Sequence, residues 1–261
     1  MNNIVSCKLM GGLGNYLFQI AATYAYSLNF SKDFSVDVSD TMVVHKPVSN
    51  YLDNIFRKIK FVNNESFSHF FHQSGHHFET IPFFDSNLKL VGHFQSEKYF
   101  SDFESQIKNL FEIDDTTKKY LTQKYSNLSK NPNCSVHVRR GDYLNHPHHH
   151  PVLKKEYYES IINQFDTDTF FYIFSDDLNW CKENFDFVKN KILVQDNTDF
   201  QDLYLMSMCD NNIIANSSFS WWGAWLNANV NKKIYAPKNW FGPAYSHFNM
   251  DDTYPKSWQV I

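Results

Sequence analysis

Two consecutive arginines follow a segment that is typical of a buried strand. Cys134 to Val138 is predicted to form this strand, and Arg139 and Arg140 stand at its carboxyl end. Ligands of open α/β sheets bind at that edge, and a guanidinium donates paired, charge-assisted hydrogen bonds to phosphate. The alternative is a surface ion pair in which Asp142 neutralises one of the arginines. The residue types therefore fit either a diphosphate site or a structural pair.

A glycine-rich turn near the N-terminus is a second candidate for anion binding. It comprises Gly11, Gly12, Leu13, Gly14 and Asn15, between a predicted strand and a predicted helix. Glycines let the backbone approach a ligand closely, and a helix N-terminus favours negative charge. No G-x-G-x-x-G fingerprint is present, and a tight structural turn is the alternative.

Ser217 and Ser218 occupy a similar junction, within the segment ANSSFSWWG that follows another predicted strand. Serine at the start of a helix commonly acts as an N-cap. Hydroxyl groups and free backbone N–H groups at such a position also form an anion pocket. The two roles are compatible.

Adjacent carboxylates, Asp176 and Asp177, end the predicted strand Phe170 to Phe174. Carboxylates at a strand end suggest a metal site, but the side chains of consecutive residues diverge. A helix cap by either aspartate is the alternative.

The histidine-rich segment from His146 to Pro151 has proline near both ends and lacks H-x-x-x-H spacing. We expect a solvated loop here, because polar residues between prolines favour turns. Its proximity to Arg140 in the sequence leaves contact with a second substrate open.

From residue 133 onward, short apolar runs alternate with amphipathic ones, which predicts a parallel sheet covered by helices. The predicted strands are 134–138, 170–174, 192–194, 212–215 and 233–235, and the predicted helices are 153–165, 178–187, 199–208 and 219–227.

The N-terminal half starts in the same way, with a strand at 3–9 and a helix at 16–28. Residues 45–100 show little periodicity. The polar segment 118–133 is the best candidate linker. We therefore predict two domains, residues 1–130 and 131–261.

Composition limits the function classes. The 261 residues carry a formal charge of −4, so no global positive field recruits nucleic acid. Four widely spaced cysteines, Cys7, Cys134, Cys181 and Cys209, indicate buried, reduced thiols. The N-terminal segment lacks the features of a signal peptide. We expect a cytoplasmic protein, with peripheral attachment to a membrane left open.

Five ordered blocks give the sequence a family resemblance. They are GGLGNYLFQ at 11–19, VHVRRGDY at 136–143, FSDD at 174–177, DLYLMSMCDNNIIANSSFSWWGAWLN at 202–227 and APKNWF at 236–241. In this order they resemble the α-1,2-fucosyltransferases of glycosyltransferase family 11. The resemblance implies an α/β, GT-B-like fold with two facing Rossmann-like domains, the C-terminal one binding the donor.

The resemblance also implies an inverting transfer of L-fucose from GDP-β-L-fucose to the 2-hydroxyl of a galactoside, with no metal or other cofactor. A galactose-containing oligosaccharide, glycolipid or polysaccharide would be the acceptor. Arg139, Arg140 and Asn15 would be catalytic, and Asp142, Asp176 and Asp177 would support them or include the general base. The donor-binding residues would be His137, Asp202, Ser217, Ser218, Phe219, Gly12 and Gly14.

Two alternatives follow from weaker parts of the pattern. A different GT-B transferase, with another GDP-sugar or another linkage, would use the same diphosphate site. A carbohydrate-binding module that holds sugars on its aromatic side chains would need no such site.

Overall fold

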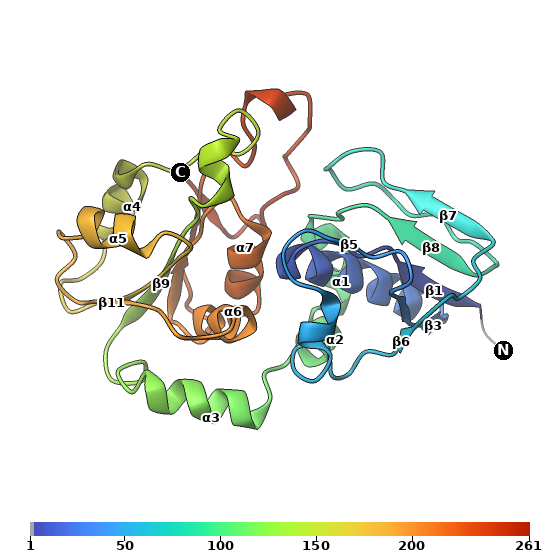
Figure 1. Ribbon diagram of the computed structural model, residues 1–261, viewed down its shortest axis with the longest axis horizontal. Coiled ribbons are helices and arrows are strands. Elements are labelled where there is room, and N and C mark those ends of the chain that lie inside the picture. Colours follow the sequence, from blue (N-terminus) through green and yellow to red (C-terminus); the bar gives the residue numbers. More distant parts are fainter. Residues whose placement is uncertain (1–2) are drawn as a thin grey trace. The chain divides into compact units, whose positions relative to one another are not determined.

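The computed structural model describes residues 3–261, which divide into two α/β units (Figure 1). Unit 1 comprises the residues up to Asp114 together with Phe248–Pro255, and unit 2 comprises Asp115–His247 and Lys256–Ile261. The sequence-based division lay at residues 130 and 131, within the polar segment 118–133. Helix α3 (Asp115–Lys124) fills the first part of that segment. It belongs to unit 2 because it packs against α6 there through its buried face.

Unit 1 is built on a parallel four-stranded sheet in the order β3-β1-β8-β7. The strands are β1 (Ile4–Cys7), β3 (Asp33–Phe34), β7 (His69–His72) and β8 (Leu88–Val91). Helix α1 (Leu13–Asn29) packs against β1, and most of its side chains are buried. It begins three residues before the predicted start because Gly12, with extended backbone, takes the N-cap position.

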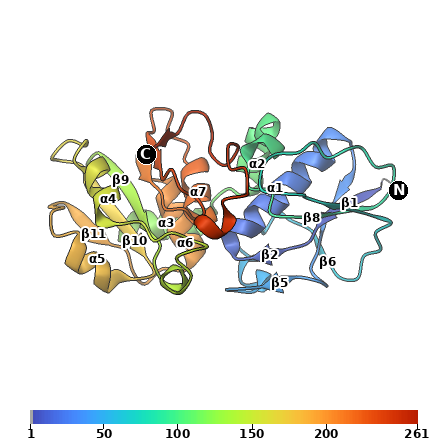
Figure 2. The same ribbon diagram turned by 90° about the horizontal axis from the view of Figure 1, so that it is seen from above.

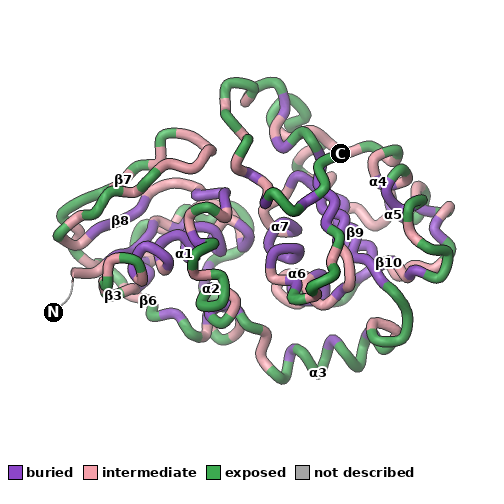
Figure 3. Tube along the Cα trace, turned by 180° about the vertical axis from the view of Figure 1, so that it is seen from behind, coloured by how far each residue is buried: buried purple, intermediate pink, exposed green. Residues whose placement is uncertain are grey.

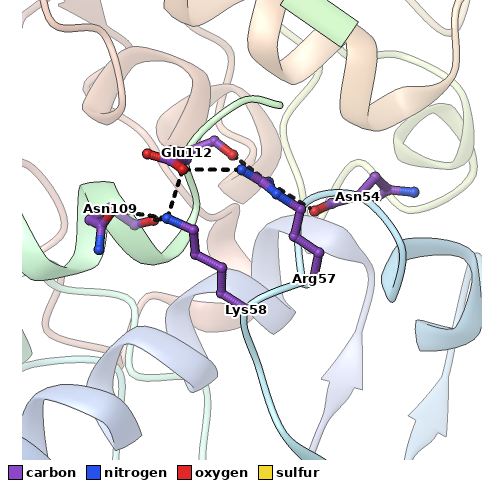
Figure 4. Close-up of polar contacts among 5 residues, drawn as sticks. All are labelled: Asn54, Arg57, Lys58, Asn109 and Glu112. Atoms are coloured by element: carbon purple, nitrogen blue, oxygen red, sulfur yellow. Dashed lines mark hydrogen bonds and ion pairs between the residues drawn. The ribbon is translucent and has the colours of Figure 1, made fainter. Parts of the chain in front are cut away.

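The other elements of unit 1 are short, and pairs between distant segments join them. Strand β2 pairs with β5, β4 pairs with β6, and α2 lies near the end of the N-terminal segment of the unit. The strands are β2 (Met10–Gly11), β4 (Val36–Asp37), β5 (Met42–Val43) and β6 (Phe61–Val62), and the helix is α2 (Glu104–Leu110). Arg57 and Lys58 both reach Glu112, just after α2, with Nη2–Oε1 and Nζ–Oε1 distances of 3.3 and 2.7 Å (Figure 4).

Unit 2 contains a parallel six-stranded sheet in the order β11-β10-β9-β12-β13-β14. The strands are β9 (Asn133–Val138), β10 (Phe170–Ser175), β11 (Lys191–Leu193), β12 (Asn211–Ile213), β13 (Ile234–Ala236) and β14 (Gln259–Val260). The predicted alternation is confirmed, and only β14 had no predicted counterpart. The chain adds strands outward on one side of β9, then reverses and continues from β12. Ligands of such sheets bind at this switch point.

Helices cover both faces of this sheet (Figures 1 and 2). The helices are α4 (Lys155–Ile162), α5 (Leu178–Asn184), α6 (Asp199–Ser207) and α7 (Ser218–Trp225). Val136 and Val138 of β9 join the core beneath α4 and α5. His137 faces the opposite side, where its ring lies 5.7 Å from that of Phe219 on α7. Strand β9 is buried along its whole length (Figure 3).

The four cysteines are free and buried, as the sequence indicated. Burial raises the pKa of Cys7 to about 12 and that of Cys181 to about 11, and it raises the pKa values of Cys134 and Cys209 well above 9.0. Thiolate formation is therefore suppressed at neutral pH. Across residues 3–261, no helix combines the length and apolar character that crossing a bilayer requires.

Candidate functional site

Arg139 and Arg140 stand at the switch point of the unit 2 sheet, directly after β9. Strand β10 runs in register beside β9 and pairs Ser175 with Val138, so the residues that follow the two strands are neighbours. Asp176 and Asp177 therefore lie next to the arginines. The parallel register explains why two motifs that are 36 residues apart meet at one edge of the sheet.

Arg139 is held by two carboxylates. Its Nη2 lies 2.6 Å from Asp142 Oδ1, and its Nη1 lies 2.8 Å from Asp176 Oδ2. Asp176 also accepts a hydrogen bond from the backbone N–H of Arg140. Gly141 makes this arrangement possible, since a Cβ there would lie 2.6 Å from Asp176 Oδ2. The surface ion pair considered from the sequence thus exists, with a second acidic partner.

Arg140 is fixed differently, by stacking and by a second aspartate. Its guanidinium lies 4.2 Å from the centre of the Trp180 ring, and its Nε donates to Asp177 Oδ2 at 3.0 Å. Asp177 is also the N-cap of α5, where its side chain accepts from the N–H of Trp180. This backbone hydrogen bond and the nearby Arg140 lower the pKa of Asp177, so it is ionised at neutral pH.

His137 lies beneath this site and is almost fully buried, with 7% of its surface exposed. Burial, and secondarily the charge of Arg139, lowers its pKa from 6.5 to about 3. The ring is therefore neutral at physiological pH. Its Nδ1 is buried and has no hydrogen-bond partner among the described residues. Because the ring is neutral, His137 adds no positive charge beside the arginines at that pH.

The amino end of α7 lies at the same edge of the sheet, after β12. Ser217 is its N-cap residue, but its side chain makes no capping hydrogen bond. Ser217, Ser218 and Phe219 are all partly exposed, whereas Asn216 before them is buried. The first-turn N–H groups of a helix favour an anion. The Ser217 side chain therefore does not cap α7, and the first-turn N–H groups of the helix suit an anion.

Asp202 lies in the first turn of α6, the helix that packs against α7. Its Oδ1 accepts a hydrogen bond from Asn197 Nδ2 at 2.8 Å. The same amide nitrogen of Asn197 donates to the Tyr125 hydroxyl at 2.9 Å. Asp202 is therefore a partly exposed carboxylate with a defined orientation.

The glycine-rich turn belongs to unit 1. Gly11 has a φ of 93°, which favours glycine, and a Cβ on it would lie 2.2 Å from Asn15 Nδ2. The Asn15 side chain thus covers Gly11, and its Oδ1 accepts from Gln95 Nε2 at 2.8 Å. Gly12 is partly exposed and Gly14 is buried at the start of α1. Gln95 had no signal in the sequence, because residues 45–100 lack clear periodicity.

The histidine-rich loop is attached to a neighbouring loop. The N–H groups of Gly242 and Ala244 donate to the carbonyl oxygens of His149 and His148, at 2.8 and 2.9 Å. His150 is partly buried and stacks on Tyr143 with a ring separation of 4.6 Å. Most of the loop is exposed, as expected, but its backbone is ordered by these contacts.

Within unit 2 the structure brings together most of the residues that the sequence suggested. These are His137, Arg139, Arg140, Asp142, Asp176, Asp177, Ser217, Ser218 and Phe219. Trp180, Tyr143 and Asn216 also contact this group and were not predicted to do so. In residues 3–261, no group of three or more His, Cys, Asp or Glu side chains has an arrangement that could hold a metal ion.

Comparisons with known proteins agree with this architecture. The sequence matches the model of the family described as glycosyl transferase family 11 over residues 2–261. It is 30% identical to an α-1,2-colitosyltransferase of Escherichia coli, with 99% of each chain covered. It is also 30% identical to the O-antigen biosynthesis glycosyltransferase WbnK of Escherichia coli, covering 94% of this chain and 98% of that one.

A mammalian relative and a solved structure extend the comparison. The galactoside α-(1,2)-fucosyltransferase 1 of Rattus norvegicus is 28% identical over 64% of this chain and 52% of its own length. The NodZ α-1,6-fucosyltransferase of Bradyrhizobium, from a crystal soaked with GDP-fucose, has a TM-score of 0.59 at 12% identity. That alignment covers 87% of this chain and 93% of NodZ, and the likeness concerns the fold. The predicted GT-B class is thereby confirmed.

Proposed function

Because the chain belongs to glycosyl transferase family 11, we propose that it transfers L-fucose from GDP-β-L-fucose to the 2-hydroxyl of a galactoside. The observation that carries this proposal is the position of Arg139 and Arg140. The sequence has three arginines, and two of them are adjacent at the switch point of the unit 2 sheet, where α7 starts after the neighbouring strand β12. Guanidinium groups and helix N-termini both suit a diphosphate.

The proposed mechanism is an inverting displacement. The bond between the sugar carbon and the GDP oxygen breaks while the acceptor oxygen approaches from the opposite face, and negative charge grows on the leaving phosphate. Arg139, Arg140 and the α7 N–H groups would stabilise that charge without a metal. Loss of one such preorganised donor typically raises the barrier by about 2.7 to 4 kcal/mol.

The remaining residues would bind the donor. The neutral His137 and Phe219 would contact the nucleoside, Asp202 would accept hydrogen bonds from guanine, and Ser217 and Ser218 would contact phosphate. Asn15, with Gly12 and Gly14, would contact the fucosyl group. These roles rest on the family motifs in the sequence.

The three aspartates of the site would support the arginines. Asp142, Asp176 and Asp177 all pair with Arg139 or Arg140. The lowered pKa of Asp177 makes it a poor proton acceptor. We therefore assign these carboxylates to orientation of the guanidinium groups rather than to removal of the acceptor proton.

A colitosyl donor is the second candidate, favoured by the identity with the α-1,2-colitosyltransferase. The colitosyl group lacks one hydroxyl group of the fucosyl group. A site that hydrogen-bonds this hydroxyl would reject the deoxy donor strongly, whereas a site that does not would accept both. The ratio of kcat/KM for the two donors therefore decides between them.

The test is a transfer assay in the presence of EDTA, with GDP-fucose, GDP-colitose and GDP-mannose as donors and a panel of β-galactosides as acceptors. We expect GDP release with GDP-fucose and an α-1,2 linkage in the product. Arg139→Ala should abolish transfer. Arg57→Ala is the control, because it removes the third arginine, which is also ion-paired, and it should leave transfer intact (Figure 4). Absence of transfer to every galactoside, or an active Arg139→Ala variant, would refute the proposal. The cytoplasmic location stays a prediction.

A further inference from the structure

Asn216 joins three loops at the carboxyl edge of the unit 2 sheet. It follows β12, immediately before the N-cap of α7, and 2% of its surface is exposed. Its Nδ2 donates to the carbonyl oxygens of Pro151 and Trp240, each at 3.1 Å. Pro151 ends the histidine-rich loop, and Trp240 lies in the loop after β13. One buried amide therefore fixes both loops to the segment that starts α7.

Tyr143 connects this segment to Arg139. Its hydroxyl donates to the backbone oxygen of Asn216 at 2.9 Å. Its ring centre lies 5.3 Å from the Arg139 guanidinium and 4.6 Å from the ring of His150. Arg139 and the amino end of α7 are thus linked through two residues, Tyr143 and Asn216.

The link spans the point where the strand order reverses. Arg139 follows β9 and Ser217 follows β12, and these two strands are adjacent in the sheet. Donors that stabilise a developing charge must keep their relative positions, since small displacements reduce the stabilisation. The pairing of β9 with β12 ends at Val136 and Ile213, and the Tyr143–Asn216 hydrogen bond adds a contact between the segments that follow these strands.

We propose that Tyr143 and Asn216 are positioning residues that hold Arg139 and the amino end of α7 at the separation required by a diphosphate. This proposal rests on the proposed function, because it assumes that both elements bind the diphosphate of a GDP-sugar. Neither residue is assigned a contact with the donor.

Tyr157 provides a matched control. Its hydroxyl also donates to a backbone oxygen of the β12 segment, that of Ile214, at 2.9 Å. Tyr157 lies on α4, on the side of the sheet away from His137. Tyr157→Phe and Tyr143→Phe therefore each remove one hydroxyl that is bonded to nearly the same stretch of backbone, but only Tyr143 reaches Arg139.

The experiment is calorimetric titration of the full chain with GDP and with GMP, which lacks the β-phosphate. Tyr143→Phe should weaken GDP binding about fivefold while GMP affinity changes little, the effect expected for one neutral hydrogen bond. Asn216→Asp should weaken GDP binding further, because a carboxylate cannot donate to the two carbonyl oxygens. Tyr157→Phe should leave the ratio of GDP to GMP affinity unchanged.

The proposal is overturned if the ratio of GDP to GMP affinity in Tyr143→Phe equals that of the wild type. A loss of thermal stability in this variant, without a change in that ratio, does not rescue the proposal. The GDP affinity of Asn216→Asp is interpreted only if circular dichroism shows that the variant is folded. If it is not folded, the result for Tyr143→Phe alone decides the proposal. A wild-type protein that binds no GDP refutes the proposed function itself, before any variant is compared.

Discussion

Asp176 bridges the two arginines: its Oδ2 lies 2.8 Å from Nη1 of Arg139, and its Oδ1 accepts from the N–H of Arg140 at 2.9 Å. Its side chain is 26% exposed, compared with 51% for Asp142, the other partner of Arg139. The two aspartates therefore differ in how firmly they orient the same guanidinium.

We predict that Asp176→Asn lowers kcat for transfer by about tenfold, because the arginine loses its better-buried ionic partner. Asp142→Asn should lower it by less than about fivefold, since exposed ion pairs contribute about 0 to 1 kcal/mol. Initial rates at saturating donor measure both. Equal losses in the two variants would contradict the different roles inferred from exposure.

Arg139 and Arg140 should respond differently to lysine. Arg139→Lys keeps the charge but loses the planar fork, and we expect transfer to fall by about 100-fold with little change in melting temperature. Arg140→Lys also loses the stacking on Trp180, so its melting temperature should fall as well. Rates and thermal melts of the two variants provide the comparison. Similar melting temperatures would show that the Trp180 contact contributes little.

Acid should destabilise the protein partly through His137. Its folded pKa of about 3 lies below the ordinary 6.5, so between these values only the unfolded chain binds the proton. The stability that the neutral ring contributes is complete above pH 6.5 and is lost as the pH falls toward 3. The slope is at most about 1.4 kcal/mol per pH unit.

Urea unfolding at pH 7, 6, 5 and 4 should therefore show a smaller loss for His137→Gln than for the wild type. Some loss should remain, because burial also lowers the pKa of His76, to about 4. Parallel stability curves for variant and wild type would contradict the assignment to His137.

Gln95 should affect sugar transfer through Asn15. Gln95→Ala removes the hydrogen bond to Asn15 Oδ1 within unit 1, and we expect about tenfold lower kcat with unchanged GDP affinity. Gln164→Ala is a suitable control, because the exposed Gln164 Nε2 also makes one hydrogen bond, to the Ser160 carbonyl. A parallel loss of GDP affinity in Gln95→Ala would argue against a role confined to the fucosyl group.

The sheet of unit 2 was predictable because buried parallel strands form continuous apolar runs, such as Phe170 to Phe174. The short strands of unit 1 were not predictable in this way. Strands β4 and β6 have two residues each, too few to show a period, and they are stabilised by pairing with distant segments. Strand β14 escaped prediction for the same reason.

The arginines and their aspartates were recognisable because strand ends mark the binding edge of a sheet. The sequence left open whether Asp176 would bind a metal, cap a helix, support the arginines or act as the general base. The register between β9 and β10 places it beside Arg139 and Arg140. Trp180 and Asn216 carry no local signal, since their contacts depend on tertiary packing.

The chain passes between the two units three times, after Asp114, after His247 and after Pro255. The returning segment supplies Phe248, whose ring lies 4.5 Å from that of His76, and Asp252, which accepts from the N–H of Phe78 and pairs with Lys98. A single proteolytic cut would therefore free neither unit. A chimera that exchanges unit 1 between relatives must carry residues 248–255 as well as the N-terminal segment, because two separate segments of the coding sequence encode this unit.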